Sequence, residues 1–379
     1  MPLPITLGAA SARGLGWSRT YAPAVAAGGL WTWGENASAQ LGLGNFTSYS
    51  SPKQVGALTT WVQTSSGYRW STAIKSDGTL WTWGQNSYGQ LGLGDTTLRN
   101  SPVQVGALTT WSQVSAGKDH AAAIKTDGTL WTWGRGAYGR LGDGTTTNRS
   151  SPVQVGALTT WLQVSAGYQF TAAIRTDGTL WTWGQNSYGQ LGINNQTEYS
   201  SPKQVGSLTT WAQVSAADSF CAAVQTDGTL WTWGRNNSGQ MGIGTLSITQ
   251  ASSPTQVGAL TTWSRVSAAR QLCAAIRTNG TLWTWGYNGG GTLGLGDYTS
   301  RSSPTQVGAL TTWSQVAAGR LHMGAIRTDG TLWTWGSSYN GQLGLNNKTT
   351  YNSPKQVGAL TTWSQVATSK RWNTLAVRS

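Results

Sequence analysis

The sequence predicts an all-β fold: a seven-bladed β-propeller whose blades are four-stranded and antiparallel. Two motifs, each present seven times, lead to this prediction. The tetrapeptide WTWG begins at Trp31, Trp81, Trp131, Trp181, Trp231, Trp283 and Trp333. The motif TTW ends at Trp61, Trp111, Trp161, Trp211, Trp263, Trp313 and Trp363, near which the repeats start. A unit of about fifty residues copied seven times indicates one repeat array rather than two or three separate domains.

One unit, residues 111–160, shows the strands that each repeat is expected to form. Its apolar runs are short, rich in β-forming residues and bounded by Gly, Pro, Asn or Asp. We expect the first three strands at residues 113–116, 121–125 and 129–133. The pair Asp127-Gly128 provides the tight turn that a hairpin between the second and third strands requires.

The fourth strand follows a long Gly-rich connection, residues 135–151, and lies near Val153, or near Val103 of the preceding copy. Pro152 restricts this strand to an edge, because proline cannot donate a ladder hydrogen bond. Four short strands in each of seven repeats are typical of a propeller, in which neighbouring blades bury one another's faces. In WTWG the two indoles are two residues apart and so share one sheet face, where they are expected to pack against an adjacent blade.

The two ends of the chain are expected to complete one blade together. Residues 363–379 carry the first two strands of a repeat, and the missing third strand begins at Leu30. The alternative is that an imperfect copy of the opening strands, at residues 17–26, occupies the same slot. We predict residues 1–24 to be a tail or anchor and residues 25–379 to be one propeller, with the last repeat completed by residues 25–60.

Composition narrows the classes of function. Charged residues are 10% and apolar residues 38% of the chain, which argues against a disordered protein. The formal net charge of +13 favours an acidic partner, whether nucleic acid, anionic glycan or acidic protein. The first thirty residues lack the pattern of a signal peptide, and no stretch is long and apolar enough for a membrane helix. We therefore expect no membrane insertion, and the compartment, virion or cytoplasm, stays open.

The sequence gives little support to catalysis. His120 and His322 occupy matching sites in well-separated repeats, and no Ser-His-Asp or Cys-His arrangement can be drawn from repeat positions. Cys221 and Cys273 lack CxxC spacing and are expected to be small buried apolar residues. We predict a protein that is not an enzyme and has no metal or cofactor.

Differences among the seven copies suggest where a partner binds. The segments GALTTW and TDGTLWTWG hardly change, whereas the turn between the first and second strands and the long connection after WTWG vary. In an up-and-down blade these two segments share one face of the disc. The alternative is relaxed drift, because exposed turns vary in any protein. Aromatic and arginine residues at the turns favour binding, because binding energy concentrates on those types.

The turns hold six basic and two acidic residues, and the long connections hold seven and five. The constant turns instead pair a recurring Lys or Arg with an Asp two residues later, a ring expected to neutralise itself. The seventh turn, Lys370-Arg371-Trp372, has one extra residue. The candidate binding residues are Tyr68, Arg69, Trp70, Lys118, Asp119, His120, Tyr168, Gln169, Phe170, Asp218, Phe220, Arg270, Arg320, His322, Arg371 and Trp372.

The repeats resemble those of the regulator of chromosome condensation. The shared pattern appears here as Val114, Gly117, His120, Asp127, Gly128, Leu130, Trp133 and Gly134, with Asn86, Gly89, Gln90, Leu91 and Gly92 in the neighbouring copy. The resemblance implies a seven-bladed propeller. The founding member of the family is an exchange factor for a small GTPase and also binds chromatin, and it uses a wedge inserted within one blade and a basic N-terminal tail. No repeat here exceeds its neighbours by more than two residues, which leaves no room for such a wedge. The nearly identical sequences of the repeats are similar to those of bacterial and phage members.

We therefore expect a non-enzymatic binding scaffold that presents variable aromatic and basic turns to a protein or an anionic surface glycan. The setting would be a phage virion or a bacterial surface. The alternative is a chromatin-binding or GTPase-exchange regulator like the founding member, with nucleic acid as a partner that is possible but not favoured. An enzyme that uses the central channel is the least favoured class.

Overall fold

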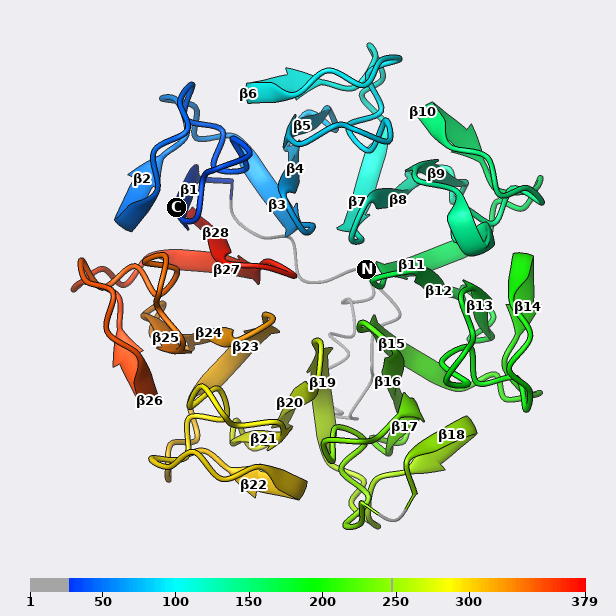
Figure 1. The fold of residues 1–379 in the computed structure, drawn as a ribbon, viewed down its shortest axis with the longest axis vertical. Coiled ribbons are helices and arrows are strands. Elements are labelled where there is room, and N and C mark those ends of the chain that lie inside the picture. The colour runs from blue at the N-terminus through cyan, green and yellow to red at the C-terminus, as the bar shows by residue number, and fades with distance from the viewer. Residues whose placement is uncertain (1–26, 247) are drawn as a thin grey trace, which may run out of the picture.

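Seven four-stranded antiparallel sheets form a ring in the computed structural model, which describes residues 27–246 and 248–379 (Figure 1). This confirms the predicted all-β propeller. Blades 1 to 6 each consist of four consecutive strands, and blade 7 has the strand order β2-β1-β28-β27. The predicted tail, residues 1–24, and the competing segment at residues 17–26 lie outside the described residues.

The strands have the following bounds. Blade 1 contains β3 (Trp61–Ser66), β4 (Trp70–Lys75), β5 (Leu80–Gly84) and β6 (Arg99–Gln104), and blade 2 contains β7 (Trp111–Ala116), β8 (His120–Lys125), β9 (Leu130–Gly134), the 3-10 turn η1 (Ala137–Gly139) and β10 (Arg149–Gln154). Blade 3 contains β11 (Trp161–Ala166), β12 (Phe170–Arg175), β13 (Leu180–Gly184) and β14 (Tyr199–Gln204), and blade 4 contains β15 (Trp211–Ala216), β16 (Phe220–Gln225), β17 (Leu230–Arg235) and β18 (Gln250–Gln256). Blade 5 contains β19 (Trp263–Ala268), β20 (Leu272–Arg277), β21 (Leu282–Gly286) and β22 (Arg301–Gln306), and blade 6 contains β23 (Trp313–Ala318), β24 (His322–Arg327), β25 (Leu332–Gly336) and β26 (Tyr351–Gln356). Blade 7 contains β27 (Trp363–Thr368), β28 (Asn373–Arg378), β1 (Gly29–Gly34) and β2 (Tyr49–Gln54).

Burial changes from the inner strand of a blade to the outer one. In blade 2 the second strand, β8, is buried at its first five positions and reads His-Ala-Ala-Ala-Ile, because sheets of both neighbouring blades cover it and leave room mainly for small side chains. The outer strand β10 is partly exposed and pairs only with β9. Pro152 therefore occupies the edge strand, as predicted.

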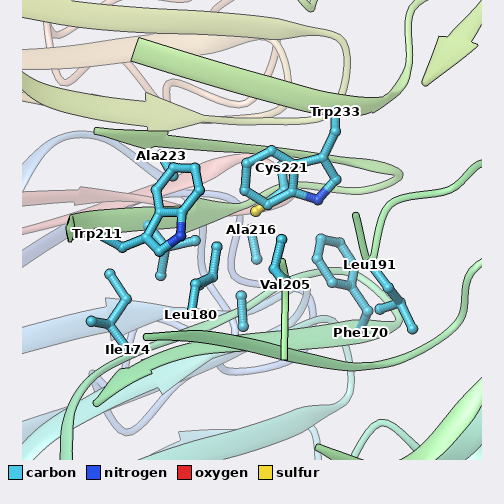
Figure 2. Close-up of a cluster of buried hydrophobic side chains, with 12 residues drawn as sticks. Phe170, Ile174, Leu180, Leu191, Val205, Trp211, Ala216, Cys221, Ala223 and Trp233 are labelled. Atoms are coloured by element: carbon cyan, nitrogen blue, oxygen red, sulfur yellow. The ribbon is translucent and has the colours of Figure 1, made fainter. Parts of the chain in front are cut away.

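Tryptophans pack the interfaces between blades. Figure 2 shows one such core, where Phe170, Ile174 and Leu180 of blade 3 meet Trp211 and Trp233 of blade 4. The ring centroids of Trp211 and Trp233 are 6.0 Å apart in an edge-to-face arrangement. This geometry stabilises an aromatic pair in addition to the effect of burying its apolar surface.

The second indole of each WTWG motif also bonds to the preceding blade. The Trp233 Nε1 donates to the backbone oxygen of Gln190 at 2.9 Å, and the corresponding indoles of the other blades make the same bond. This contact fixes the long connection of one blade against the core of the next. It confirms that the tryptophans join adjacent blades.

Strands from the two ends of the chain close the ring in blade 7. The strands β1 and β28 pair along six residues, from Gly29 opposite Arg378 to Gly34 opposite Asn373. The Trp33 Nε1 donates to the oxygen of Gln342 in blade 6 at 2.9 Å. The expected closure by N- and C-terminal strands is therefore confirmed.

Two glycines of blade 1 offer a matched test of how the long connection seats the tryptophan of the next blade. Gly92 and Gly106 have φ values of 72° and 59°, so alanine at either position costs about 1 kcal/mol in backbone strain. A Cβ on Gly92 would lie 2.7 Å from the Trp133 Nε1, whereas a Cβ on Gly106 would meet nothing within 4 Å. We expect Gly92→Ala to lower the free energy of unfolding at least twofold more than Gly106→Ala, measured by denaturant titration. Equal losses would contradict this packing argument.

Candidate functional site

The variable segments gather on one face of the disc. The nitrogen of Gln85, which begins a long connection, donates to the oxygen of Arg69 in the first turn at 2.9 Å. In blade 2 the nitrogen of Arg135 donates in the same way to the oxygen of Asp119 at 2.8 Å. We call this the variable face, and the opposite side, which carries the hairpin turns such as Asp127-Gly128, the constant face.

The seven turns of the variable face lie around the axis of the ring at the ends of the inner strands (Figure 1). We call residues 67–69, 117–119, 167–169, 217–219, 269–271, 319–321 and 369–372 the turn ring. Backbone bonds join neighbouring turns: Tyr68 donates to Lys118, Lys118 to Gly167, and Lys370 to Gly67. These bonds tie the second residue of each of these three turns to a neighbouring turn.

Aromatic and basic side chains converge across the axis. The ring centroids of Tyr68 and Tyr168 are 6.2 Å apart in an edge-to-face arrangement, although blade 2 separates their blades. The Lys118 Nζ lies over both rings, 4.3 Å from the centroid of Tyr168 and 5.7 Å from that of Tyr68. Lys370 reaches from blade 7 and donates to the oxygens of Ala116 and Ala166 at 3.1 and 2.7 Å.

One carboxylate, Asp218, lies among these cations. Burial raises its pKa to about 6, against the lowering effects of Lys370, Arg270, Arg320 and Lys118 in that order. Its oxygen is 4.0 Å from the Arg270 Nε. Burial also lowers the pKa of Lys370 to about 8, which the charge of Asp218 opposes. We call Tyr68, Lys118, Tyr168, Asp218, Arg270, Arg320 and Lys370 the axis cluster.

Elsewhere on the variable face the opposite charges are mostly paired. Arg371 lies 2.8 Å from Glu35, and Arg135 lies 3.5 Å from Asp119. Further ion pairs join Arg99 to Asp95, Arg149 to Asp143 and Arg301 to Asp297 at 2.6 to 2.8 Å. Once these pairs cancel, the axis cluster keeps a net positive charge, because four cations there face the carboxylate of Asp218. The rest of the excess positive charge of this face lies on Arg69, Arg140, Arg235 and Lys348.

Five predicted binding residues are completely buried. They occupy the first position of the second strand, where the side chain points between blades instead of outward: Trp70, His120, Phe170, Phe220 and His322. The expectation that they are exposed turn residues is wrong. With 0% exposure they cannot touch a partner in this conformation.

The two buried histidines are held in one tautomer. The Thr374 Oγ1 donates to the oxygen of Gln342 and so accepts from the Nε2 of His322, 3.0 Å away. Thr171 fixes His120 in the same way. The Nδ1 of each imidazole is buried with no partner among the described residues. Burial lowers the pKa of His120 well below its usual value and that of His322 to about 4.

The remaining predicted residues surround the axis cluster. Arg371 lies over the rings of Tyr68 and Trp372, and Arg320 lies over Trp372. Arg69 and Gln169 are partly exposed beside the second turn residues. The sequence prediction missed Lys370, which the extra residue of the seventh turn could have indicated, and it missed Glu35, the ion partner of Arg371.

On the constant face, only some of the recurring basic residues pair with the aspartate two residues later, as was predicted for all of them. Arg175 and Arg327 lie 3.7 and 3.6 Å from Asp177 and Asp329. The corresponding Lys75 forms no ion pair among the described residues and lies over an indole instead. The predicted self-neutralising ring is therefore incomplete.

No group of three His, Cys, Asp or Glu side chains within residues 27–246 and 248–379 is arranged to hold a metal ion. Over the same residues, no helix is long and apolar enough to cross a membrane. The chemistry that the axis cluster offers is attraction of an anion to ammonium and guanidinium groups beside aromatic rings.

Comparisons with known proteins agree on the repeat type. The profile of the RCC1-like domain matches residues 154–379, and the regulator of chromosome condensation (RCC1) repeat matches residues 27–74, 77–124 and 127–174, with a second RCC1 repeat profile at residues 61–90 and 111–140. No curated protein matches the chain in sequence.

Solved structures share the fold at low identity. Human WBSCR16 is 21% identical with a TM-score of 0.83, covering 93% of this chain and 99% of its own. Prp20p from Saccharomyces cerevisiae, described with its binding properties to Gsp1p and histones, is 18% identical with a TM-score of 0.82 and coverages of 93% and 92%. Yeast RCC1 (Prp20) bound to Kap60 is 17% identical with a TM-score of 0.81 and coverages of 98% and 97%.

Proposed function

Because the chain belongs to the regulator of chromosome condensation repeat family, we propose that it is a non-enzymatic interaction module whose variable face holds an acidic protein surface over the axis cluster. The observation that carries this proposal is that Lys118 lies over the rings of Tyr68 and Tyr168 at the axis, where Lys370 also reaches across to blades 2 and 3. The charges of Lys370, Arg270, Arg320 and Lys118 all act on the carboxylate of Asp218. Such an excess of cations attracts a carboxylate-rich surface and speeds its association.

The rigidity of the frame supports a binding role. The backbone bonds of the turn ring and the pairing of Tyr68 with Tyr168 fix the cationic groups before a partner arrives. Groups that are already ordered lose little conformational entropy on binding. The tyrosine rings add apolar contact area beside the charges, as residues that dominate binding energy usually do.

Neutralising two cations of the axis cluster should weaken binding selectively. We expect Lys118→Gln with Arg320→Gln to reduce affinity for an acidic peptide of alternating Glu and Asp about tenfold or more, since hydrogen bonds to charged groups contribute about 1.5–3 kcal/mol each. Fluorescence anisotropy at 50 mM and 300 mM salt measures the effect. Lys53→Gln with Lys203→Gln, which removes the same charge from exposed positions of two outer strands, is the control. Equal losses in the two double variants would contradict a localised site.

The alternative, a chromatin or GTPase regulator, is tested in the same assay. Prp20p is described as binding Gsp1p and histones, and an 18% identical structure transfers the fold alone. Tight binding of duplex DNA or of a GDP-loaded small GTPase, with little binding of the acidic peptide, would favour that alternative. The phage or bacterial-surface setting stays a prediction, which adjacent capsid, tail or envelope genes would test.

The affinity of the axis cluster should fall as pH rises. Below pH 6 Asp218 becomes neutral and the cluster more positive, whereas above pH 8 Lys370 loses its charge. We expect the acidic peptide to bind most tightly near pH 5.5 and most weakly near pH 9. Asp218→Asn should remove the part of the change that Asp218 causes near pH 6. It should also move the loss caused by Lys370 to lower pH, because the charge of Asp218 no longer raises the pKa of Lys370. A profile that the variant leaves unaltered would exclude Asp218 as its source.

A further inference from the structure

Grooves of one kind recur between adjacent blades toward the constant face. The groove between blades 7 and 1 has a volume of about 390 Å³, and the one between blades 1 and 2 about 500 Å³. In the first, Trp61, Lys75 and Trp81 of blade 1 face Gln54 and Leu58 from the end of blade 7. In the second, Trp111, Lys125 and Trp131 form the same wall. We call these two the lysine grooves.

The ammonium groups of the lysine grooves have no hydrogen-bond acceptor among the described residues. The Lys75 Nζ lies 3.7 Å from the centroid of Trp81 and 5.0 Å from that of Trp61. The Lys125 Nζ lies 3.7 and 5.1 Å from Trp131 and Trp111. Burial lowers the pKa of both lysines, and the charge of Asp77 or Asp127 opposes that shift. Three N–H donors of each amine are thus unused in a partly desolvated site.

Three of the four arginines at the same register in other blades are already engaged, whereas Arg378 of blade 7 lies over the ring of Trp31. The Nε of Arg175, Arg277 and Arg327 each donates to a threonine hydroxyl at 2.8 to 2.9 Å. Arg175 and Arg327 also lie within 4 Å of an aspartate. The two lysine grooves therefore differ from the register positions of Arg175, Arg277 and Arg327, whose donors are in use.

The walls of the lysine grooves offer two further features. Trp81 and Trp131 are partly exposed, and Leu58 and Leu108 are about half exposed at the rim. An occupant is thus expected to combine a flat apolar surface with one negative charge.

We propose that each lysine groove binds one carboxylated sugar residue, a hexuronate, of an acidic glycan. The C–H face of the sugar packs on the exposed indole, and its carboxylate accepts hydrogen bonds from the lysine ammonium. Charge complementarity selects this occupant over a neutral sugar, and grooves of 300–1,000 Å³ suit small ligands. Because the two grooves flank blade 1 on one side of the ring, a single glycan chain that engages both gains avidity.

Binding of sodium tetragalacturonate, followed by tryptophan fluorescence and calorimetry, tests the proposal. We expect Lys75→Met with Lys125→Met to lower the affinity at least tenfold, since methionine retains the aliphatic stem and removes the charge. The matched control, Arg175→Met with Arg327→Met, should bind as the unaltered protein does. The methyl-esterified tetramer, which has the same rings without charge, should bind at least tenfold more weakly. If the double lysine variant unfolds early, each single variant should instead lose one of two sites.

Three results would overturn the proposal: unaltered binding by the double lysine variant, an equal loss in the arginine control, or equal affinity for the esterified tetramer. The same holds if the unaltered protein does not bind the tetramer at millimolar concentration. The Lys118→Gln with Arg320→Gln variant should bind tetragalacturonate normally, because the axis cluster lies on the opposite face. A failure of the glycan site is therefore distinguishable from a failure of the proposed function.

Discussion

A chain that ends at Trp372, and so lacks β28, is expected not to fold cooperatively. Leu375, Ala376 and Val377 are 0% exposed and belong to the cores on both sides of blade 7. Each large apolar side chain lost from a core costs about 2–5 kcal/mol, and β27 also loses β28, its strand partner among the described residues. Together with opening of the ring, these losses approach the whole stability of a typical domain, about 5–15 kcal/mol. Scanning calorimetry should show no sharp transition, and a transition within a few degrees of the full chain would contradict this.

A circular permutant separates the loss of β28 from the loss of closure. The nitrogen of Trp61 donates to the oxygen of Gly28 at 3.1 Å, as the nitrogen of Trp111 does to Gly78. Gly28 therefore occupies the glycine position of the Asp-Gly hairpin turn. Joining Ser379 to Gly28 through one aspartate rebuilds the Ser-Asp-Gly turn of blade 1, and new ends can be opened between Asp127 and Gly128. We expect this permutant to melt cooperatively, with blade 2 now closed by the two ends of the chain.

The fold could be predicted because local signals repeat. The Asp127-Gly128 turn, the short β-forming runs around it and Pro152 each define one feature of a blade, and seven copies repeat them. Ring closure followed from counting which strand each end of the chain lacks. Periodicity therefore supplied the long-range pairing that a single sequence usually leaves open.

The site was predicted less well because its geometry depends on neighbouring blades. The strand β8 begins at His120, one residue earlier than expected. His120 is therefore part of the strand, where side chains alternate between opposite faces, and its side chain lies in the core. Nothing local indicates that Tyr68 and Tyr168 meet over the axis, because their contact spans two blade interfaces. Lys370 reaches blades 2 and 3 by the length of its side chain, which the repeat pattern does not encode.

The buried histidines should make the fold sensitive to mild acid. A histidine whose folded-state pKa lies below its unfolded value of about 6.5 stabilises the fold while neutral, and that stability is lost as pH falls through this window. For His322 the window runs from about 6.5 to 4, which corresponds to about 3 kcal/mol in total, and His120 adds to it in the same direction. Asp218 acts oppositely, because its raised pKa favours the folded state as pH falls below 6.

The histidine effect is therefore clearest in an Asp218→Asn background. There we expect the free energy of unfolding to fall by at least 2 kcal/mol between pH 7 and 4.5, most of the shift that His322 alone provides. His120→Phe with His322→Phe should nearly abolish this fall, since blades 3 and 4 already accommodate phenylalanine at the same buried position, Phe170 and Phe220. Urea titrations at the two pH values measure the difference. Phenylalanine has no imidazole to take up a proton. An equal fall in the free energy of unfolding with and without the two histidines would therefore show that other groups cause it.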